Sequence, residues 1–251
     1  MQSLGLVPAL DLETLDDLKR VVDATCDIDE VVEYKLGMHA VLHIGLFNAV
    51  KAIREFTEKP VIYDHQKAGA DMPDSAGGFV RICEQTGISG LILFPVAGPT
   101  AVREFVTHSL NAGLDPVVGG HIPVPDYAIS GGGYLADDTV DRIMALSASL
   151  GATHFVLPAN EPENIQRRSE WLLAHVIEPV LYVTGIGPLG GSITESFRAA
   201  QGIATRRAII GRRICAAGDP HAATQTLADE MNRFSGNTHY FHQFPLTTSN
   251  D

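Results

Sequence analysis

Short apolar runs alternate along the chain with longer segments in which apolar residues recur at helical spacing. The short runs are almost continuously apolar, which is typical of parallel strands that are buried on both faces. The longer segments have the spacing of helices that bury one face. The predicted strands are residues 6–10, 31–36, 61–63, 90–94, 116–118, 154–157, 180–183 and 208–210.

A predicted helix follows each predicted strand. Eight such βα units predict a single (β/α)8 TIM barrel of the α/β class, with a doubly wound open sheet as the alternative. Because no segment resembles a linker, we expect one domain over residues 1–251, with a C-terminal tail from about residue 235. The predicted helices are residues 15–24, 40–56, 76–85, 100–111, 137–149, 164–175, 193–204 and 220–232.

Composition and charge narrow the classes of partner. Of the 251 residues, 45% are hydrophobic and 19% charged, as in an ordinary folded domain. The formal net charge of −12 argues against nucleic-acid or acidic-membrane binding, because such proteins need basic surfaces. A phosphorylated small molecule remains compatible, since one pocket can be positive on an acidic protein.

Cysteine usage and hydropathy bear on the compartment. Cys26, Cys83 and Cys215 are far apart and form no CxxC pair, so neither a disulfide framework nor a zinc site is indicated. No apolar run has the roughly 18 to 20 residues of a membrane span, and the N-terminus lacks the features of a signal peptide. We therefore expect a soluble, cytoplasmic protein without a membrane partner.

Charged residues follow the first three predicted strands, at the end of a barrel where active sites form. Asp11 follows the first strand, Lys35 ends the second, and Asp64 follows the third. A lysine at the edge of an apolar strand is costly to bury unless it is paired, so Asp11 and Asp64 are its natural partners. The alternative is that Lys35 reaches out into solvent.

The third strand leads into a run with Asp64, Lys67 and Asp71. Two carboxylates near one lysine raise its pKa and keep it protonated, which suits a general acid and disfavours a Schiff-base nucleophile. A solvated charged loop is the alternative interpretation.

A glycine-rich segment, GIGPLGG at residues 185–191, follows the seventh strand and leads into a helix beginning near Ser192. Glycines allow backbone N–H groups to approach an oxyanion at a helix N-terminus. With Arg212 directly after the eighth strand, the pattern predicts a phosphate site, although the glycines could also serve tight turning alone. Thr184, just before the loop, is a candidate neighbour of the rest of the ligand.

Taken together, these motifs resemble the orotidine 5′-monophosphate decarboxylase family over nearly the whole barrel. Sister families that act on sugar phosphates with magnesium have an acidic residue at the second strand, so Lys35 favours the decarboxylase. The matching motifs, in the family's order, are ALD with Asp11, KLG with Lys35, the Asp64, Lys67 and Asp71-Met-Pro run, GIGPLGG, and IIGRRI with Arg212.

The resemblance implies cofactor-free decarboxylation of orotidine 5′-monophosphate (OMP) to uridine 5′-monophosphate (UMP) in de novo pyrimidine biosynthesis, without a metal. Lys67 would protonate C6 as carbon dioxide leaves, with Asp64 and Asp71 flanking the carboxylate and the lysines. The remaining implied roles are ribose contacts for Asp11 and Lys35, phosphate contacts for Gly190, Gly191 and Arg212, and a homodimer in which Asp71 and Ser75 cross the interface.

Two features depart from the family pattern. The family spaces its charged run as Asp-x-Lys-x-x-Asp, whereas each gap here is one residue longer, and Leu189 stands where a glutamine is common.

The loop after the fifth strand offers His121 and Ser130 as candidate contacts to the base. The alternatives are a sugar-phosphate decarboxylase or aldolase on the same barrel, and a nucleotide-binding barrel without catalysis.

Overall fold

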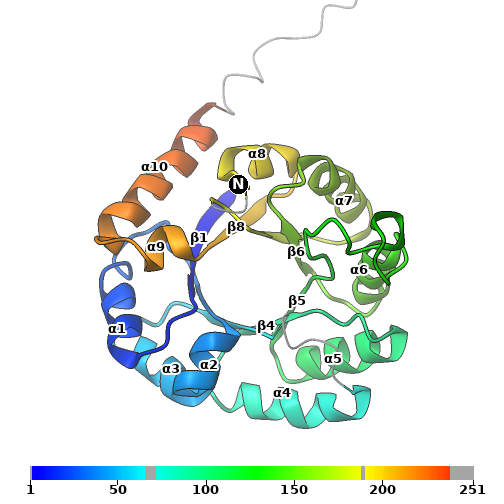
Figure 1. Cartoon of the computed structure of the whole chain (residues 1–251), viewed down its shortest axis with the longest axis horizontal. Coiled ribbons are helices and arrows are strands. Elements are labelled where there is room, and N and C mark those ends of the chain that lie inside the picture. Colours follow the sequence, from blue (N-terminus) through cyan, green and yellow to red (C-terminus); the bar gives the residue numbers. More distant parts are fainter. Residues whose placement is uncertain (1, 66–71, 188–189, 238–251) are drawn as a thin grey trace, which may run out of the picture.

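The computed structural model describes residues 2–65, 72–187 and 190–237. Eight parallel strands close into a barrel with the helices arranged around it (Figure 1). Because β1 pairs with both β2 and β8, the predicted (β/α)8 barrel is confirmed and the open sheet is wrong. The strands are β1 (Ser3–Leu10), β2 (Tyr34–Leu36), β3 (Val61–Asp64), β4 (Gly90–Leu93), β5 (Asp115–Val118), β6 (His154–Pro158), β7 (Val180–Thr184) and β8 (Thr205–Ile210).

The helices follow the strands largely as the periodicity predicts. They are α1 (Leu15–Asp23), α2 (Met38–Ile44), α3 (Leu46–Ile53), α4 (Ala76–Glu84), α5 (Pro99–Asn111), α6 (Thr139–Ser149), α7 (Pro162–His175), α8 (Ile193–Ala199), α9 (Arg212–Cys215) and α10 (Pro220–Asn237), with 3-10 turns η2 (Pro73–Ser75) and η3 (Ile129–Gly131). Within the described ranges, no helix is long and apolar enough to cross a membrane.

Three predicted boundaries need correction. The single helix predicted over 40–56 is two helices, because Gly45 has φ 85°, ends α2 and begins α3. Glycine adopts this left-handed conformation at little cost. The helix predicted over 193–204 ends at Ala199, and the helix predicted over 220–232 continues to Asn237 as α10.

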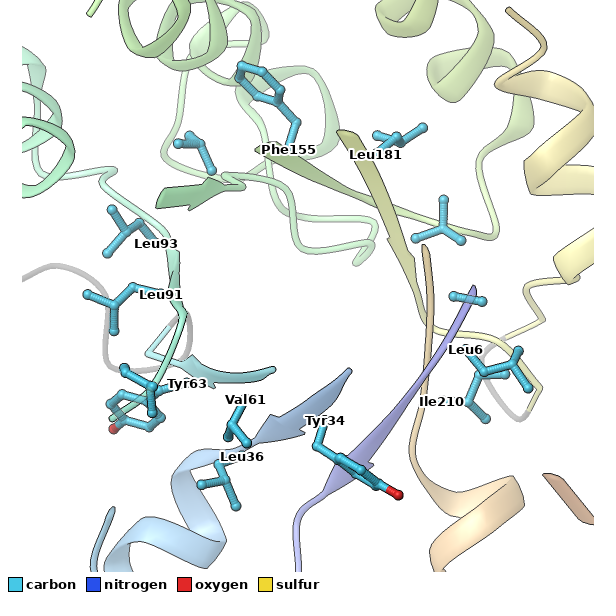
Figure 2. Close-up of a cluster of buried hydrophobic side chains, with 14 of the residues drawn as sticks. Leu6, Tyr34, Leu36, Val61, Tyr63, Leu91, Leu93, Phe155, Leu181 and Ile210 are labelled. Carbon is cyan, nitrogen blue, oxygen red and sulfur yellow. The ribbon is translucent and has the colours of Figure 1, made fainter. Parts of the chain in front are cut away.

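Side chains alternate between the two faces of each strand, as the period of two requires. One set packs outward beneath the helices, and Figure 2 shows Leu6, Leu91 and Leu181 pointing away from the barrel interior. The other set fills the interior and consists of Val7, Ala9, Ile62, Ile92, Val117, Val156, Tyr182 and Ile209.

The second strand places charged side chains in this interior. Tyr34 points outward, where its hydroxyl lies 2.8 Å from Thr25 Oγ1 of the segment after α1. Its neighbours Glu33 and Lys35 therefore share the opposite, inner face. Lys35 lies toward the carboxyl ends of the strands, and Glu33 lies two residues nearer the amino ends, at the floor of the barrel.

Glu33 is only 7% exposed and hydrogen-bonds to the inward-facing Tyr182 hydroxyl. Burial raises the pKa of Glu33 from 4.5 to about 7, although the Tyr182 hydrogen bond and the charge of Arg207 act in the opposite direction and Asp115 adds a small further rise. The folded protein therefore holds this proton more tightly than the unfolded chain does.

Replacing Glu33 by glutamine should change the pH dependence of stability. Between pH 4.5 and about 7 the wild type loses up to about 3 kcal/mol of unfolding free energy, because Glu33 ionises in the unfolded chain but keeps its proton in the fold, and Glu33→Gln avoids this loss. The measurement is urea denaturation of both proteins from pH 4.5 to 8, with Glu58→Gln at an exposed position as the control. A stability difference between wild type and Glu33→Gln that is the same at every pH would contradict the assignment.

Candidate active site

The carboxyl ends of β1, β2 and β3 bring three predicted site residues together. In the strand register Lys35 lies beside Ala9 of β1 and Ile62 of β3, which both face the interior. Asp11 and Asp64 are each two residues further along, so their side chains point to the same side. Lys35 Nζ lies 2.7 Å from Asp64 Oδ2 and 3.4 Å from Asp11 Oδ2.

This arrangement decides the state of Lys35. The residue is 5% exposed, so it is buried and paired instead of extending into solvent. Burial by itself would lower the pKa of the amine, but the carboxylates of Asp64 and Asp11 outweigh it and raise the pKa above the ordinary value. Lys35 is therefore an ammonium at neutral pH, and Asp64, at 6% exposure, is its buried counter-ion.

Gly37 makes room for this ion pairing. It precedes α2 with φ −98°, a conformation that any residue can adopt. A Cβ at this position would, however, lie 1.5 Å from Asp11 Oδ1. The glycine of the KLG motif is thus required by space, because the Asp11 carboxylate packs directly against the start of α2.

The rest of the third-strand run is only partly described. Lys67 and Asp71 lie outside the described residues, so their predicted roles stay predictions. Ser75 ends η2, where its exposed side chain donates a hydrogen bond of 2.7 Å to the Met72 carbonyl. The ring of His65, which follows Asp64, lies 4.2 Å from the ring of Phe79 in α4.

The glycine-rich loop between β7 and α8 is held by its own backbone. Gly191 N donates to Gly185 O at 3.2 Å and Gly190 N donates to Gly187 O at 2.8 Å, while Gly187 and Gly190 have φ of 93° and 87°. These two amides would have to leave their carbonyls before they could bind a phosphate. Their predicted role therefore requires a rearranged loop, and Leu189 lies outside the described residues.

The two sides of this loop contain the remaining predicted residues. Thr184 ends β7 and is half-buried. Arg212 begins α9 directly after β8, the strand paired with β7, and its side chain is exposed. The next residue, Arg213, is also exposed and lies 3.7 Å from Glu230 of α10. A Cβ at Gly187 would lie 2.8 Å from Arg213 Cδ, so Arg213 packs against the loop.

Sequence reasoning missed one feature of the barrel mouth. His121 Nε2 lies 3.0 Å from Glu161 Oε1, joining the connection after β5 to the turn after β6. The other candidate from the β5 loop, Ser130, is exposed and hydrogen-bonds to Asp137 within that loop. The only signal for Glu161 in the sequence was its place after a strand and before the proline that opens α7.

Comparison with known proteins assigns the family. The model of the orotidine 5′-phosphate decarboxylase / HUMPS family matches residues 5–227. The chain belongs to this family. No curated protein matched the sequence.

Solved structures of orotidine 5′-phosphate decarboxylases share the fold of this family member. The enzyme from Methanocaldococcus jannaschii, complexed with the inhibitor BMP, has a TM-score of 0.76 at 20% identity, covering 92% of this chain and 99% of that one. The Pyrococcus horikoshii OT3 enzyme has a TM-score of 0.72 at 19% identity, covering 90% and 99%. The Sulfolobus solfataricus enzyme has 0.70 at 16% identity, covering 93% and 100%.

Gly37→Ala should disrupt the ion pairing at the mouth, because the added methyl group occupies the position of Asp11 Oδ1. We expect the unfolding free energy to fall by about 1–3 kcal/mol, as for other overpacked sites. Gly78→Ala is the matched control, since a Cβ there meets nothing within 4 Å and the residue lies in α4. Urea denaturation measures both, and equal changes at the two glycines would refute the steric argument.

Proposed function

We propose that this family member is an orotidine 5′-monophosphate decarboxylase that converts OMP to UMP without a cofactor. The observation that carries the proposal is the Lys35 ammonium, buried between Asp11 and Asp64 at the end of the barrel where active sites form. The three strand ends thus present fixed charges of both signs, which can act on charge that develops during a reaction.

In this proposal Lys67 is the proton donor. As the bond between C6 and the carboxylate breaks, carbon dioxide leaves and its electron pair stays on C6, where the Lys67 ammonium delivers a proton. Asp64 and Asp71 flank the reacting carboxylate and keep the lysine protonated. The 2.7 Å contact between Lys35 Nζ and Asp64 Oδ2 supports the role proposed for Asp64, because it fixes the Asp64 carboxylate before substrate binds.

The substrate is anchored at a distance from the reacting carbon. The proposal assigns ribose contacts to Asp11 and Lys35, a place near the pyrimidine to Thr184, and phosphate contacts to Gly190, Gly191 and Arg212. The exposed Arg212 side chain, directly after the strand that pairs with β7, supports the phosphate assignment. Binding energy from such a remote group can hold the base against the charges where bond breaking occurs.

A homodimer is part of the proposal, with Asp71 and Ser75 reaching the neighbouring active site. Ser75 is exposed, and Met72, whose carbonyl it hydrogen-bonds, is 70% exposed. Leu42 and Phe47 of α2 and α3 are also exposed, at 75% and 61%. Exposed apolar side chains mark a protein interface where they form one contiguous patch.

Two alternatives have support of their own. The matched family also includes HUMPS enzymes, so a sugar-phosphate decarboxylase or aldolase is the second candidate. The longer charged run makes a nucleotide-binding barrel without catalysis the third. Turnover of OMP separates the proposal from both.

Purified protein treated with a chelator should decarboxylate OMP, as followed by the loss of absorbance. Lys67→Ala should lower kcat by more than about 100-fold, because it removes the proton donor at the reacting carbon. Arg212→Ala should instead raise KM by about 10- to 100-fold with a smaller change in kcat, since it removes a charged contact to a remote anchor.

Matched controls are Lys51→Ala in α3 and Arg103→Ala in α5, both at exposed positions away from the barrel mouth. These should retain wild-type kinetics. Full activity in Lys67→Ala would eliminate the mechanism, and wild-type protein that leaves OMP unchanged would eliminate the function.

A further inference from the structure

Across the barrel mouth from β1 and β2, the strand ends of β5 and β6 are joined by side chains. A Cβ at Gly119 would lie 2.8 Å from Val156 Cγ1 of the inner layer, whereas one at Gly120 would lie 3.3 Å from Ile143 of α6. The alternation along β5 therefore continues past its end. This alternation places the His121 side chain on the inner side, where it contacts Glu161.

The contact between His121 and Glu161 is held in place by a further hydrogen bond to Glu161. Glu161 Oε1 lies 3.0 Å from His121 Nε2, and Glu161 Oε2 accepts a hydrogen bond of 2.9 Å from Asn164 in the first turn of α7. The side chains of His121 and Glu161 are 16% and 25% exposed. Both oxygens of the carboxylate are thus occupied, which fixes its orientation toward the histidine.

The protonation of His121 follows from its surroundings. Burial lowers the pKa of the imidazole, Glu161 raises it and Arg168 lowers it, with a net fall below the ordinary value. His121 is therefore neutral at pH 7. Because an ionised carboxylate only accepts hydrogen bonds, Nε2 carries the hydrogen and Nδ1 is an acceptor.

Tyr127 also contacts the start of the connection after β5. Its hydroxyl donates to the Gly120 carbonyl, and its ring lies 5.1 Å from the His121 ring. The ring of Phe94, directly after β4, packs edge-to-face with the Tyr127 ring, with 6.5 Å between the two centroids. The base of the connection after β5 is therefore packed against β4 by aromatic rings and bonded to the β6 side by His121.

The turn that contains Glu161 also touches the glycine-rich loop. Ser196 of α8 donates a hydrogen bond of 3.1 Å to the Ala159 carbonyl. A Cβ at Gly191 would lie 2.6 Å from Ala159 Cβ. Residues 159–161 thus contact the glycine-rich loop on one side and, through His121, the connection after β5 on the other.

We propose that His121, oriented by Glu161, is a positioning residue that couples the wall of the mouth formed by residues 119–138 to the glycine-rich loop. The wall faces the Asp11, Lys35 and Asp64 cluster across the barrel. Its placement sets how well a nucleotide fits between that cluster and the loop. The effect on OMP rests on the proposed function, whereas the effect on the order of the wall does not.

The test compares His121→Leu, His121→Gln and Glu161→Ala with wild type. A glutamine amide can still donate to Glu161, and a leucine cannot. The control is His108→Leu with Glu104→Ala, which breaks an exposed pair of the same residue types 3.5 Å apart on α5. Amide hydrogen exchange over residues 119–138 in the ligand-free protein is measured first, followed by OMP kinetics and UMP binding by calorimetry.

Exchange over residues 119–138 should be about tenfold faster in His121→Leu and Glu161→Ala, as expected from losing one hydrogen bond to a charged group. The same two variants should raise the KM for OMP and the Kd for UMP about tenfold, with kcat within about threefold of wild type. His121→Gln should recover most of both effects, and the control should show neither.

Unchanged exchange in His121→Leu and Glu161→Ala would overturn the proposal. Faster exchange with unchanged KM and Kd would also overturn it, because the pair would then be structural alone. If the wild type binds UMP but does not turn over OMP, the proposed function fails and the UMP affinities of the variants decide the role of His121. A wild type that neither binds UMP nor turns over OMP overturns both.

Discussion

The ion pairing of Lys35 inside the barrel is the constraint on which the rest of the site depends. An unpaired ammonium in such a position costs several kcal/mol, so Lys35 can be buried only while Asp64 and Asp11 remain beside it. The pairing in turn fixes the ends of β1, β2 and β3 relative to one another. The burial of Lys35 therefore depends on the same carboxylates that the proposed function uses.

The second strand organises the barrel interior from top to bottom. Its neighbours β1 and β3 contribute Val7, Ala9 and Ile62 to the inner apolar layer, whereas the segment around β2 contributes Glu33 and Lys35. The apolar layer separates these two ionisable side chains. Barrels commonly keep function at the carboxyl ends of their strands and stability at the amino ends. Lys35 and Glu33 follow this division, since one lies among the proposed catalytic residues and the other at the floor with Tyr182.

Much of this fold could be read from the sequence, because continuous apolar runs and helical periodicity are local properties. The strands begin and end within about three residues of their predicted limits, and the pairing of Lys35 with Asp11 and Asp64 followed from the cost of burying a charge. The break at Gly45 was missed because a glycine inside a helical pattern is often tolerated. The short helix α9 was missed because four residues are too few to show a period.

Contacts between distant segments could not be found in the same way. The need for Gly37 is set by the position of Asp11, and the partner of His121 is Glu161, forty residues away. Both contacts exist only once the barrel has closed and neighbouring strand ends have come into register. The sequence showed which residues follow strands, but the side on which each head group lies depends on alternation that continues past the strand ends.

The role of the buried ammonium is tested by titrating the Lys35 side chain, with its Nζ nitrogen observed by NMR in wild type and in Asp64→Asn. We expect a pKa above the ordinary 10.5 in the wild type. We also expect a clearly lower pKa in Asp64→Asn, where the amine stays buried but loses its nearer carboxylate. A wild-type Lys35 that titrates at or below 10.5, or one that is indifferent to Asp64, would contradict the claim that a buried ammonium organises this site.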